Sequence, residues 1–289
     1  MKEAKQLLPP DALAGIRLGI SASESPDLSR LGLLEQHFRM ALGEIARCVL
    51  VSGGQLAYGG HLQPEGYTAF LSKELERYSR RDQPMLVCLA WSEHRRIGLM
   101  ALRSETRRLG LYGQIVFLDQ DGNAIDPASG REEAPPPLAD EATRRKSLTG
   151  LRRYMAKNTN GRLLIGGRRA GFQGDMPGLL EEAMFAFEQG QPVYLAGGFG
   201  GLTWDIAREL GVDQGDWFPK AANSAADEQL VRGMSRLTDV AKATGGRSLD
   251  NGLTDEQNRR LAACHRPSEI AALISLGLGR RFAGRATKS

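Results

Sequence analysis

Paired glycines, arginines and glutamates are concentrated in one short stretch of the chain, LLIGGRRAGFQGDMPGLLEEA, which runs from residue 163 to residue 183. An apolar run ends in Gly166 and Gly167, two arginines follow, and a helix-forming segment begins near Pro177. Glycine lets backbone N–H groups approach an oxyanion closely, and a helix N-terminus adds unpaired donors and partial positive charge. The stretch therefore has the chemistry of a phosphate-binding site.

Two carboxylates, Glu181 and Glu182, follow beside the apolar stripe of that helix. A carboxylate there can accept hydrogen bonds from the ribose hydroxyls of a ligand whose phosphate rests on the glycines. The alternative is that both glutamates complement the helix dipole and face water. Arg168 and Arg169 either pair with phosphate in fork geometry or form a solvated turn. We expect a bulky residue at Gly167 to block the phosphate and leave the fold intact.

Strand-like and helix-like runs alternate along the chain, which is typical of a parallel sheet with crossover helices. Strands are predicted at 16–21, 55–60, 84–91, 113–118, 162–167 and 192–198. Helices are predicted at 33–51, 66–78, 94–109, 140–158, from 177 onward, and at 202–210, 226–244, 254–263 and 267–276. The predicted fold is Rossmann-like α/β, a parallel sheet flanked by helices, with a small helical C-terminal extension.

Two regions divide this pattern. The α/β domain is expected over 14–215 and the helical extension over 216–289. Within the domain, the Pro-, Gly- and charge-rich segment 121–139 is predicted to be a surface excursion or linker, and it could instead divide two lobes. The last helix has an apolar face that must pack either on its own core or on a neighbouring subunit. The residues of that face are Ile270, Ala271, Leu273, Ile274 and Leu276.

Four strand ends have residues suited to a ligand, and ligands of open parallel sheets bind beyond the carboxyl ends of the strands. The candidate ligand contacts are Ser21, Ser23, Glu24, Ser25, Gly59, Gly60, Arg152, Gly166, Gly167, Arg168, Gly174, Met176, Pro177, Gly178, Glu181, Glu182, Gly197, Gly198, Phe199 and Gly200. The string AGGFGG departs from G-x-G-x-x-G, and no Walker A motif is present. A conventional NAD-dehydrogenase site is therefore not expected.

Composition narrows the classes of protein further. The hydrophobic share is 41% and the charged share is 25%, as in ordinary globular proteins. The start of the chain lacks the apolar run of a signal peptide. The three cysteines, Cys48, Cys88 and Cys264, are far apart, which predicts thiols in the core. Together these observations predict a cytoplasmic location. Four isolated histidines predict no metal site. The net charge of +4 mildly favours anionic partners. Because the basic runs are dispersed and aromatic residues are sparse, nucleic acid is not the expected partner.

The string LTGLRRYMAKNTNGRLLIGGRRAGFQGDMPGLLEEA, followed by FEQGQPVYLAGGFGG, resembles the SLOG superfamily. That group of Rossmann-like domains includes the LOG phosphoribohydrolases and the Smf/DprA proteins. GISASESPDL and LAYGGHL fit the same group, so the resemblance covers roughly residues 14–210. Within the group, the chain looks most like the prokaryotic sensor branch that is attached to TIR or sirtuin-type NAD-processing domains in defence systems.

The resemblance also has departures. The residues that match the PGGxGTxxE and RKxxM motifs of LOG enzymes are Gly166, Gly167, Gly178, Glu181, Glu182, Arg152 and Met155. Leu151 stands where the enzymes have an arginine, and ten residues separate Gly167 from Gly178 where the enzymes need one. Hydrolysis requires a carboxylate and a phosphate-clamping arginine in fixed geometry. Sensing is therefore favoured. In the alternative, an N-glycosidic nucleotide hydrolase, the catalytic candidates are Glu182, Glu181 and Arg152.

The resemblance implies a nucleotide ligand derived from NAD, such as an ADP-ribose isomer, with no required cofactor. It also implies protein partners: a second copy of the chain, or a fused or neighbouring effector or signal-producing protein. A membrane partner is not expected. A DNA-binding role like that of the Smf/DprA relatives is a third alternative that the positive charge permits.

Overall fold

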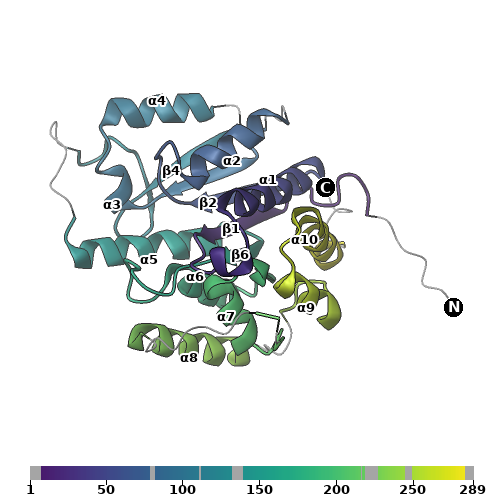
Figure 1. Cartoon of the computed structure of the whole chain (residues 1–289). Helices are drawn as coiled ribbons and strands as arrows, with labels where there is room; N and C mark the ends of the chain where they lie inside the picture. The colour runs from purple at the N-terminus through teal and green to yellow at the C-terminus, as the bar shows by residue number, and fades with distance from the viewer. Residues whose placement is uncertain are drawn as a thin grey trace.

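The computed structural model of the chain describes residues 8–78, 82–110, 112–131, 139–215, 217–218, 227–244 and 249–283. Within them, a seven-stranded sheet has helices on both faces (Figure 1). The strands are β1 (Arg17–Ser23), β2 (Gln55–Gly59), β3 (Met85–Leu89), β4 (Gly113–Leu118), β5 (Ala124–Ile125), β6 (Gly161–Gly166) and β7 (Val193–Ala196). The helices are α1 (Glu35–Val51), α2 (Tyr67–Glu76), α3 (Trp91–His94), α4 (Leu99–Leu109), α5 (Glu141–Lys157), α6 (Gly178–Glu188), α7 (Gly201–Glu209), α8 (Glu228–Ala243), α9 (Asp255–Ala263) and α10 (Pro267–Phe282), with single 3-10 turns at η1 (Ser29–Leu31) and η2 (Gly197–Phe199).

The strand order places a switch in direction beside the first strand. Across the sheet the order is β5-β4-β3-β2-β1-β6-β7, and every neighbouring pair is parallel except β4 and β5. The chain therefore builds outward from β1 to β4, crosses back, and continues on the other side of β1 with β6. In such sheets the crevice for a ligand opens where the order reverses, between the carboxyl ends of β1 and β6.

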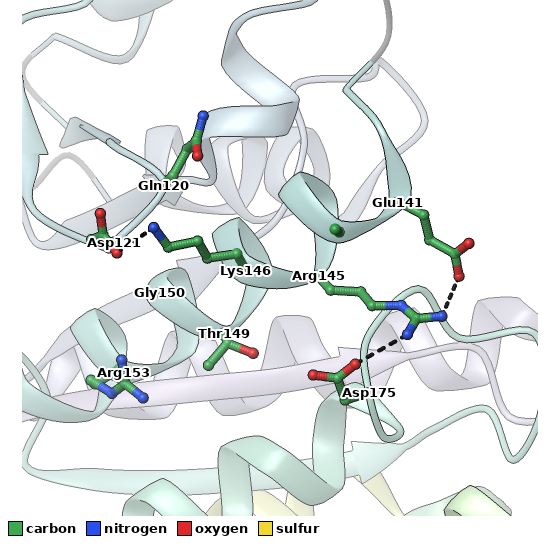
Figure 2. Close-up of a pocket in the computed structure, with 10 residues that line it drawn as sticks. Gln120, Asp121, Glu141, Arg145, Lys146, Thr149, Gly150, Arg153 and Asp175 are labelled. Carbon is green, nitrogen blue, oxygen red and sulfur yellow. Dashed lines mark hydrogen bonds and ion pairs between the residues drawn. The ribbon is translucent and has the colours of Figure 1, made fainter.

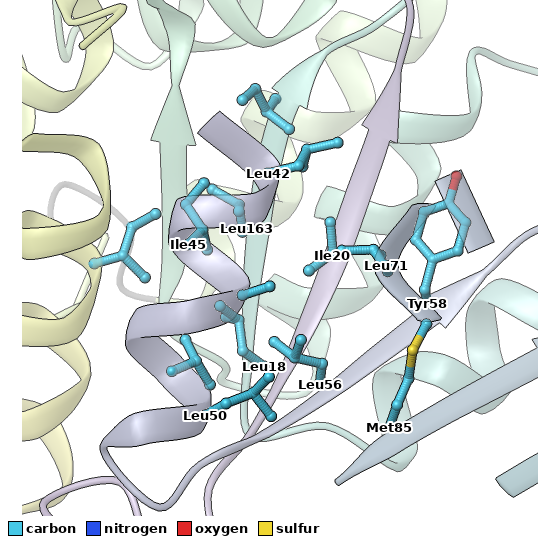
Figure 3. Packing of buried hydrophobic residues seen from close by; sticks show 14 of the residues in the cluster. Leu18, Ile20, Leu42, Ile45, Leu50, Leu56, Tyr58, Leu71, Met85 and Leu163 are labelled. Atoms are coloured by element: carbon cyan, nitrogen blue, oxygen red, sulfur yellow. The ribbon is translucent and has the colours of Figure 1, made fainter. Parts of the chain in front are cut away.

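The sheet is held by apolar layers on its two faces. On one face, Leu18, Ile20 and Leu56 of the strands pack against Leu42 and Ile45 of α1, and all five are at most 1% exposed (Figure 3). A second cluster, on the other face, joins β6 and β7 to α6, α7 and α8. Burial of these side chains from water is the main term that stabilises the sheet. The predicted Rossmann-like α/β fold is confirmed.

The last helix packs on its own chain. Ile270, Leu273 and Ile274 of α10 are at most 8% exposed and belong to the same core cluster as α1. The helix extends beyond the predicted end at 276, and Phe282 in its last turn is buried as well. Of the two alternatives for this apolar face, the structure has the packing on its own core. The face is therefore not available as a subunit interface.

The first part of the predicted excursion is bound to the domain. Its β5 pairs antiparallel with β4, and Arg95 donates hydrogen bonds to the carbonyl oxygens of Ser129 and Gly130. Arg131 donates in turn to the carbonyl oxygen of Ile97 at 2.7 Å. β5 thus forms one edge of the sheet, residues 129–131 are hydrogen-bonded to Arg95 and Ile97, and 132–138 lie outside the described residues.

Candidate functional site

A cavity of about 490 Å³ lies at the predicted crevice. It is bounded by the carboxyl ends of β1 and β2, by α1 and α2, by the first turn of α6, and by the loop that follows β6. Predicted site residues that line this cavity are Ser23, Glu24, Gly59, Gly60, Arg152, Arg168, Gly178 and Glu182. We call it the switch-point cavity. It brings together three of the four strand ends that the sequence singled out.

Among the described residues, Glu182 is one of four glutamates that line the switch-point cavity, with Glu24, Glu35 and Glu65. Its side chain is 19% exposed, and its Oε2 accepts a hydrogen bond from the hydroxyl of Ser21, at the end of β1. The same oxygen lies 3.5 Å from Nη1 of Arg162, and Oε1 lies 4.0 Å from Nε of Arg152. Glu182 is thus held by one hydroxyl group and two guanidinium groups. Its carboxylate oxygens can still accept hydrogen bonds from a ligand in the cavity.

Arg162 is a charge buried in the middle of the sheet. It belongs to β6, its side chain is fully buried, and its Nε and Nη2 have no hydrogen-bond partner in the described structure. The guanidinium crosses its neighbour on β1, because a Cβ on Gly19 would lie 2.7 Å from Arg162 Cζ. Burial lowers the pKa of Arg162, while the charge of Glu182 acts in the opposite direction. Glu182 therefore compensates this buried charge.

Glu181 has a different environment from its neighbour in the chain. Its carboxylate pairs with Arg152 and accepts a hydrogen bond from Thr149 at 2.7 Å, and the side chains of Glu181 and Arg152 are each 10% exposed. Two of the candidate glycines make room for this arginine. A Cβ on Gly178 would lie 2.8 Å from Arg152 Nη2, and one on Gly174 would lie 3.0 Å from Nη1. Glu181 and Arg152 therefore neutralise each other in the wall of the cavity.

The paired glycines after β6 are required by the path of the chain. Both have positive φ, +70° at Gly166 and +108° at Gly167. A Cβ on Gly167 would lie 2.8 Å from Leu202 Cβ and 2.9 Å from Leu179 Cδ2. The expectation that a bulky residue at Gly167 leaves the fold intact is therefore wrong. The glycine lets β6 pack closely on α6 and α7.

The glycine loop after β7 is buried against α9. A Cβ on Gly198 would lie 2.0 Å from the carbonyl oxygen of Cys264, and one on Gly197 would lie 2.6 Å from that of Ala262. Phe199 is fully buried in the core. These residues and Gly200 do not line the switch-point cavity. Gly197 and Gly198 allow α9 close to the sheet, whereas a Cβ on Gly200 would meet Asp27 and Phe199 packs against Phe38.

The N-terminus of α7, which follows that loop, holds a carboxylate of the chain itself. The backbone N–H of Gly201 donates to Asp27 Oδ2 at 2.7 Å. Nη1 of Arg169 lies 2.7 Å from the same oxygen, and Nη1 of Arg30 lies 3.0 Å from Oδ1. The Asp27 side chain is only 3% exposed. A carboxylate therefore occupies the position at which a helix N-terminus would bind a ligand phosphate.

The comparison with known families follows from this geometry. A family model described as SLOG cluster2 matches residues 12–261. The chain belongs to this family. The match confirms the predicted SLOG superfamily, and it indicates a function related to nucleotides. A search of the curated proteins finds no match.

The remaining candidates in this SLOG protein lie around the cavity or behind it. Arg168 pairs with Glu24 at 2.7 Å across the mouth of the crevice, and both side chains are 60% exposed. Ser25 is buried and accepts a hydrogen bond from the backbone N–H of Asp27. Met176 and Pro177 are also buried, and Met176 belongs to the cluster of α6 and α8. These last three anchor the loops and do not line the cavity.

One wall of the switch-point cavity was found from the sequence only through Gly59 and Gly60. It comes from α1, α2 and the end of β2, and its residues are Glu35, Arg39, Tyr58, His61 and Tyr67. The hydroxyl of Tyr67 donates to Glu35 at 2.8 Å. Burial is the main cause that raises the pKa of Tyr67, and this hydrogen bond is the second. Burial, with the charge of Glu182, also raises the pKa of Tyr58. The sequence marked Gly59 and Gly60 in this wall but not the side chains around them, which the pairing of β2 with β1 brings to the site.

A second cavity, of about 680 Å³, lies along the outer face of α5 (Figure 2). Most of its charges are paired with one another: Arg145 lies between Glu141 and Asp175, and Lys146 pairs with Asp121 at 2.7 Å. The guanidinium of Arg153 lies over the ring of Phe185. Although larger, it is a shallow surface away from the switch point. Among the described residues, no three His, Cys, Asp or Glu side chains come together as metal ligands, and no helix is long and apolar enough to cross a membrane.

Proposed function

We propose that this SLOG protein is a cytoplasmic sensor that binds an NAD-derived or ADP-ribose-like nucleotide in the switch-point cavity. The observation that carries the proposal is the position of Glu182. Its carboxylate is held by Ser21 and Arg162 and faces the cavity beside the first turn of α6. A fixed carboxylate that can accept two hydrogen bonds suits the adjacent hydroxyls of a ribose.

The phosphate of the ligand is assigned to the start of α6. Gly178 and Leu179 of its first turn line the cavity, and a helix N-terminus favours an anion. Arg168 adds a positive charge at the mouth, where its exposed ion pair with Glu24 is weak enough for a phosphate to replace the carboxylate. The start of α7 is not assigned a phosphate, because Asp27 occupies it.

Binding without turnover is favoured by the pairing of Glu181. A general base needs a carboxylate that can reach the attacking water, and Glu181 is held by Arg152 and Thr149. The alternative is a LOG-type phosphoribohydrolase. The observation that favours it is that Glu182 Oε1 lies only 4.0 Å from Arg152 Nε, so one carboxylate and one arginine do meet at the cavity wall.

The output of the sensor is part of the proposal. A nucleotide signal in a bacterial defence or stress-signalling system would be read by this chain and passed to a partner. That partner is a fused or neighbouring effector, or a second copy of the chain.

Calorimetry with ADP-ribose, NAD and AMP tests the proposal, and mass spectrometry of the same mixtures detects any product. We expect saturable binding of at least one nucleotide with no change in its mass. Release of a free base would establish the hydrolase instead. Absence of binding by all three ligands at millimolar concentration would refute the assignment of this cavity to such nucleotides.

A further inference from the structure

Phe172 is the phenylalanine without a structural role in the fold. All nine phenylalanines of the chain lie in the described residues. The other eight each belong to or pack against a core cluster, or make a ring or cation contact. Phe172 has neither, is only half-buried, and lines the switch-point cavity. Part of this side chain is therefore exposed at the cavity.

The loop that carries Phe172 is held at its two ends. Near the start, Arg169 pairs with Asp27 at 2.7 Å and donates to both carboxylate oxygens of Asp205. At the end, the buried Met176 is inserted between α6 and α8. Phe172 lies midway between these anchors. Its position is therefore set by a loop whose ends belong to the core, while the ring itself is not packed into that core.

The backbone beside Phe172 leaves room for a ligand. Gly171 precedes it with φ of +67°, and a Cβ at Gly171 would find no atom within 4 Å. Gly171, Phe172 and Gln173 all line the cavity that Glu182 faces. A ligand bound through its ribose at Glu182 therefore lies in the same cavity as this ring.

We propose that Phe172 is the stacking platform for the planar base of the nucleotide, and that it makes the site selective for ligands that carry a base. The inference rests on the proposed function, because it assigns the base of the same ligand whose ribose and phosphate are assigned above. A base stacks on an aromatic ring through its π-face, whatever its hydrogen-bond pattern. Phe172 thus discriminates nucleotides from ribose phosphates.

The test compares two ligands that differ in the base alone, AMP and ribose 5-phosphate, by calorimetry on three proteins. Phe172→Leu keeps an apolar side chain of similar size without the ring, and Phe172→Tyr keeps the ring. We expect Phe172→Leu to bind AMP about tenfold or more weakly, since stacking of one base contributes that much affinity. Its affinity for ribose 5-phosphate should equal that of the wild type, and Phe172→Tyr should bind AMP as the wild type does.

Asp175→Asn is the matched control, because Asp175 is exposed on the same loop and does not line the cavity. It should leave the ratio of the two affinities unchanged. An equal loss of both ligands in Phe172→Leu would overturn the stacking role in favour of a general effect on the loop. Unchanged AMP affinity in Phe172→Leu would overturn it outright while the nucleotide site stands. If the wild type binds neither ligand, nor ADP-ribose, the proposed function fails and this inference fails with it.

Discussion

Ser21 donates a hydrogen bond to Glu182, which follows it by 161 residues in the chain. The bond joins the end of β1 to the first turns of α6, across the point where the strand order reverses. Ser21 and Arg162 both contact Oε2 of Glu182, which leaves Oε1 as the oxygen for a ligand hydroxyl. The Glu182 carboxylate is therefore fixed in position while one of its oxygens can still accept a hydrogen bond from a ligand.

The first prediction concerns this carboxylate. Glu182→Gln should weaken nucleotide binding by about 1–3 kcal/mol, because an amide makes weaker hydrogen bonds to ribose hydroxyls than a carboxylate does. It should also lower the free energy of unfolding by about 3 kcal/mol, because it removes the charge that compensates the buried Arg162. Calorimetry with ADP-ribose measures the effect. If the chain is a hydrolase, the same substitution should instead spare binding and eliminate release of the base.

Glu181→Gln and Glu188→Gln are the controls for that prediction. Glu181→Gln removes the partner of the buried Arg152 and should lower the free energy of unfolding by about 3 kcal/mol, with a smaller effect on binding. Glu188, at the exposed end of α6, should affect neither quantity. A binding loss in Glu181→Gln as large as that in Glu182→Gln, in a protein of wild-type stability, would contradict the division of roles between the two glutamates.

Much of the fold could be predicted from the sequence because its signals are local. Strands such as β3 and β6 are short apolar runs bounded by Gly, Pro or charge, and helices such as α1 have apolar residues at helical spacing. The strand β5 could not be predicted. It has two residues, and the hydrogen bonds from Arg95 that hold the segment after it to the domain span 34 and 35 residues.

The candidate site was predicted only in part, because some of its contacts are local in sequence and others join distant residues. The charged residue in the apolar run GRLLIGG, Arg162, was a visible signal of a buried polar contact, but its partner Glu182 was not identifiable from spacing. Glycines were the least specific signal. The glycines at Gly167 and Gly198 both resembled ligand-binding glycines in the sequence. Both are instead explained by close contact with other elements, which only the tertiary structure shows. Asp27 shows the same limit, since its contact with Gly201 spans 174 residues.

The second prediction replaces the expectation for Gly167. Gly167→Ala should destabilise the fold by several kcal/mol, because its Cβ meets Leu202 and Leu179 and its φ of +108° is unfavourable for an L-residue. Gly171→Ala is the matched control: φ is also positive, but the space is open, so about 1 kcal/mol is expected. Urea unfolding measures both. Equal midpoints for the two variants would show that the contact with Leu202 and Leu179 is not limiting.

The third prediction concerns pH. Burial lowers the pKa of His94 to about 4, and the nearby charges of Arg95 and Arg131 act in the same direction. Its Nε2 lies 2.9 Å from the carbonyl oxygen of Leu118. Because the unfolded chain protonates near pH 6.5, the contribution of His94 to stability is present above that pH and is lost as the pH falls toward 4.

The loss should amount to on the order of 2 kcal/mol between pH 6.5 and 4. His94→Gln removes the titrating group and keeps a hydrogen-bond donor, so the difference in unfolding free energy between wild type and variant should shrink as the pH falls over this range. A difference that stays constant with pH would mean that His94 titrates normally in the folded protein.

The last prediction concerns the anion position at the start of α7. Asp27→Asn should destabilise the fold by about 2 kcal/mol, because the helix N-terminus and Arg169 lose their shared negative charge. Sulfate should then raise the melting temperature of Asp27→Asn more than that of the wild type at equal ionic strength, since the uncompensated positive charge of Arg169 and the helix N-terminus favours a bound anion. Asp205→Asn is the control, because Asp205 also pairs with Arg169, whereas the N–H of Gly201 at the helix N-terminus donates to Asp27. Equal responses to sulfate in the wild type and both variants would show that α7 binds no anion once Asp27 is neutral.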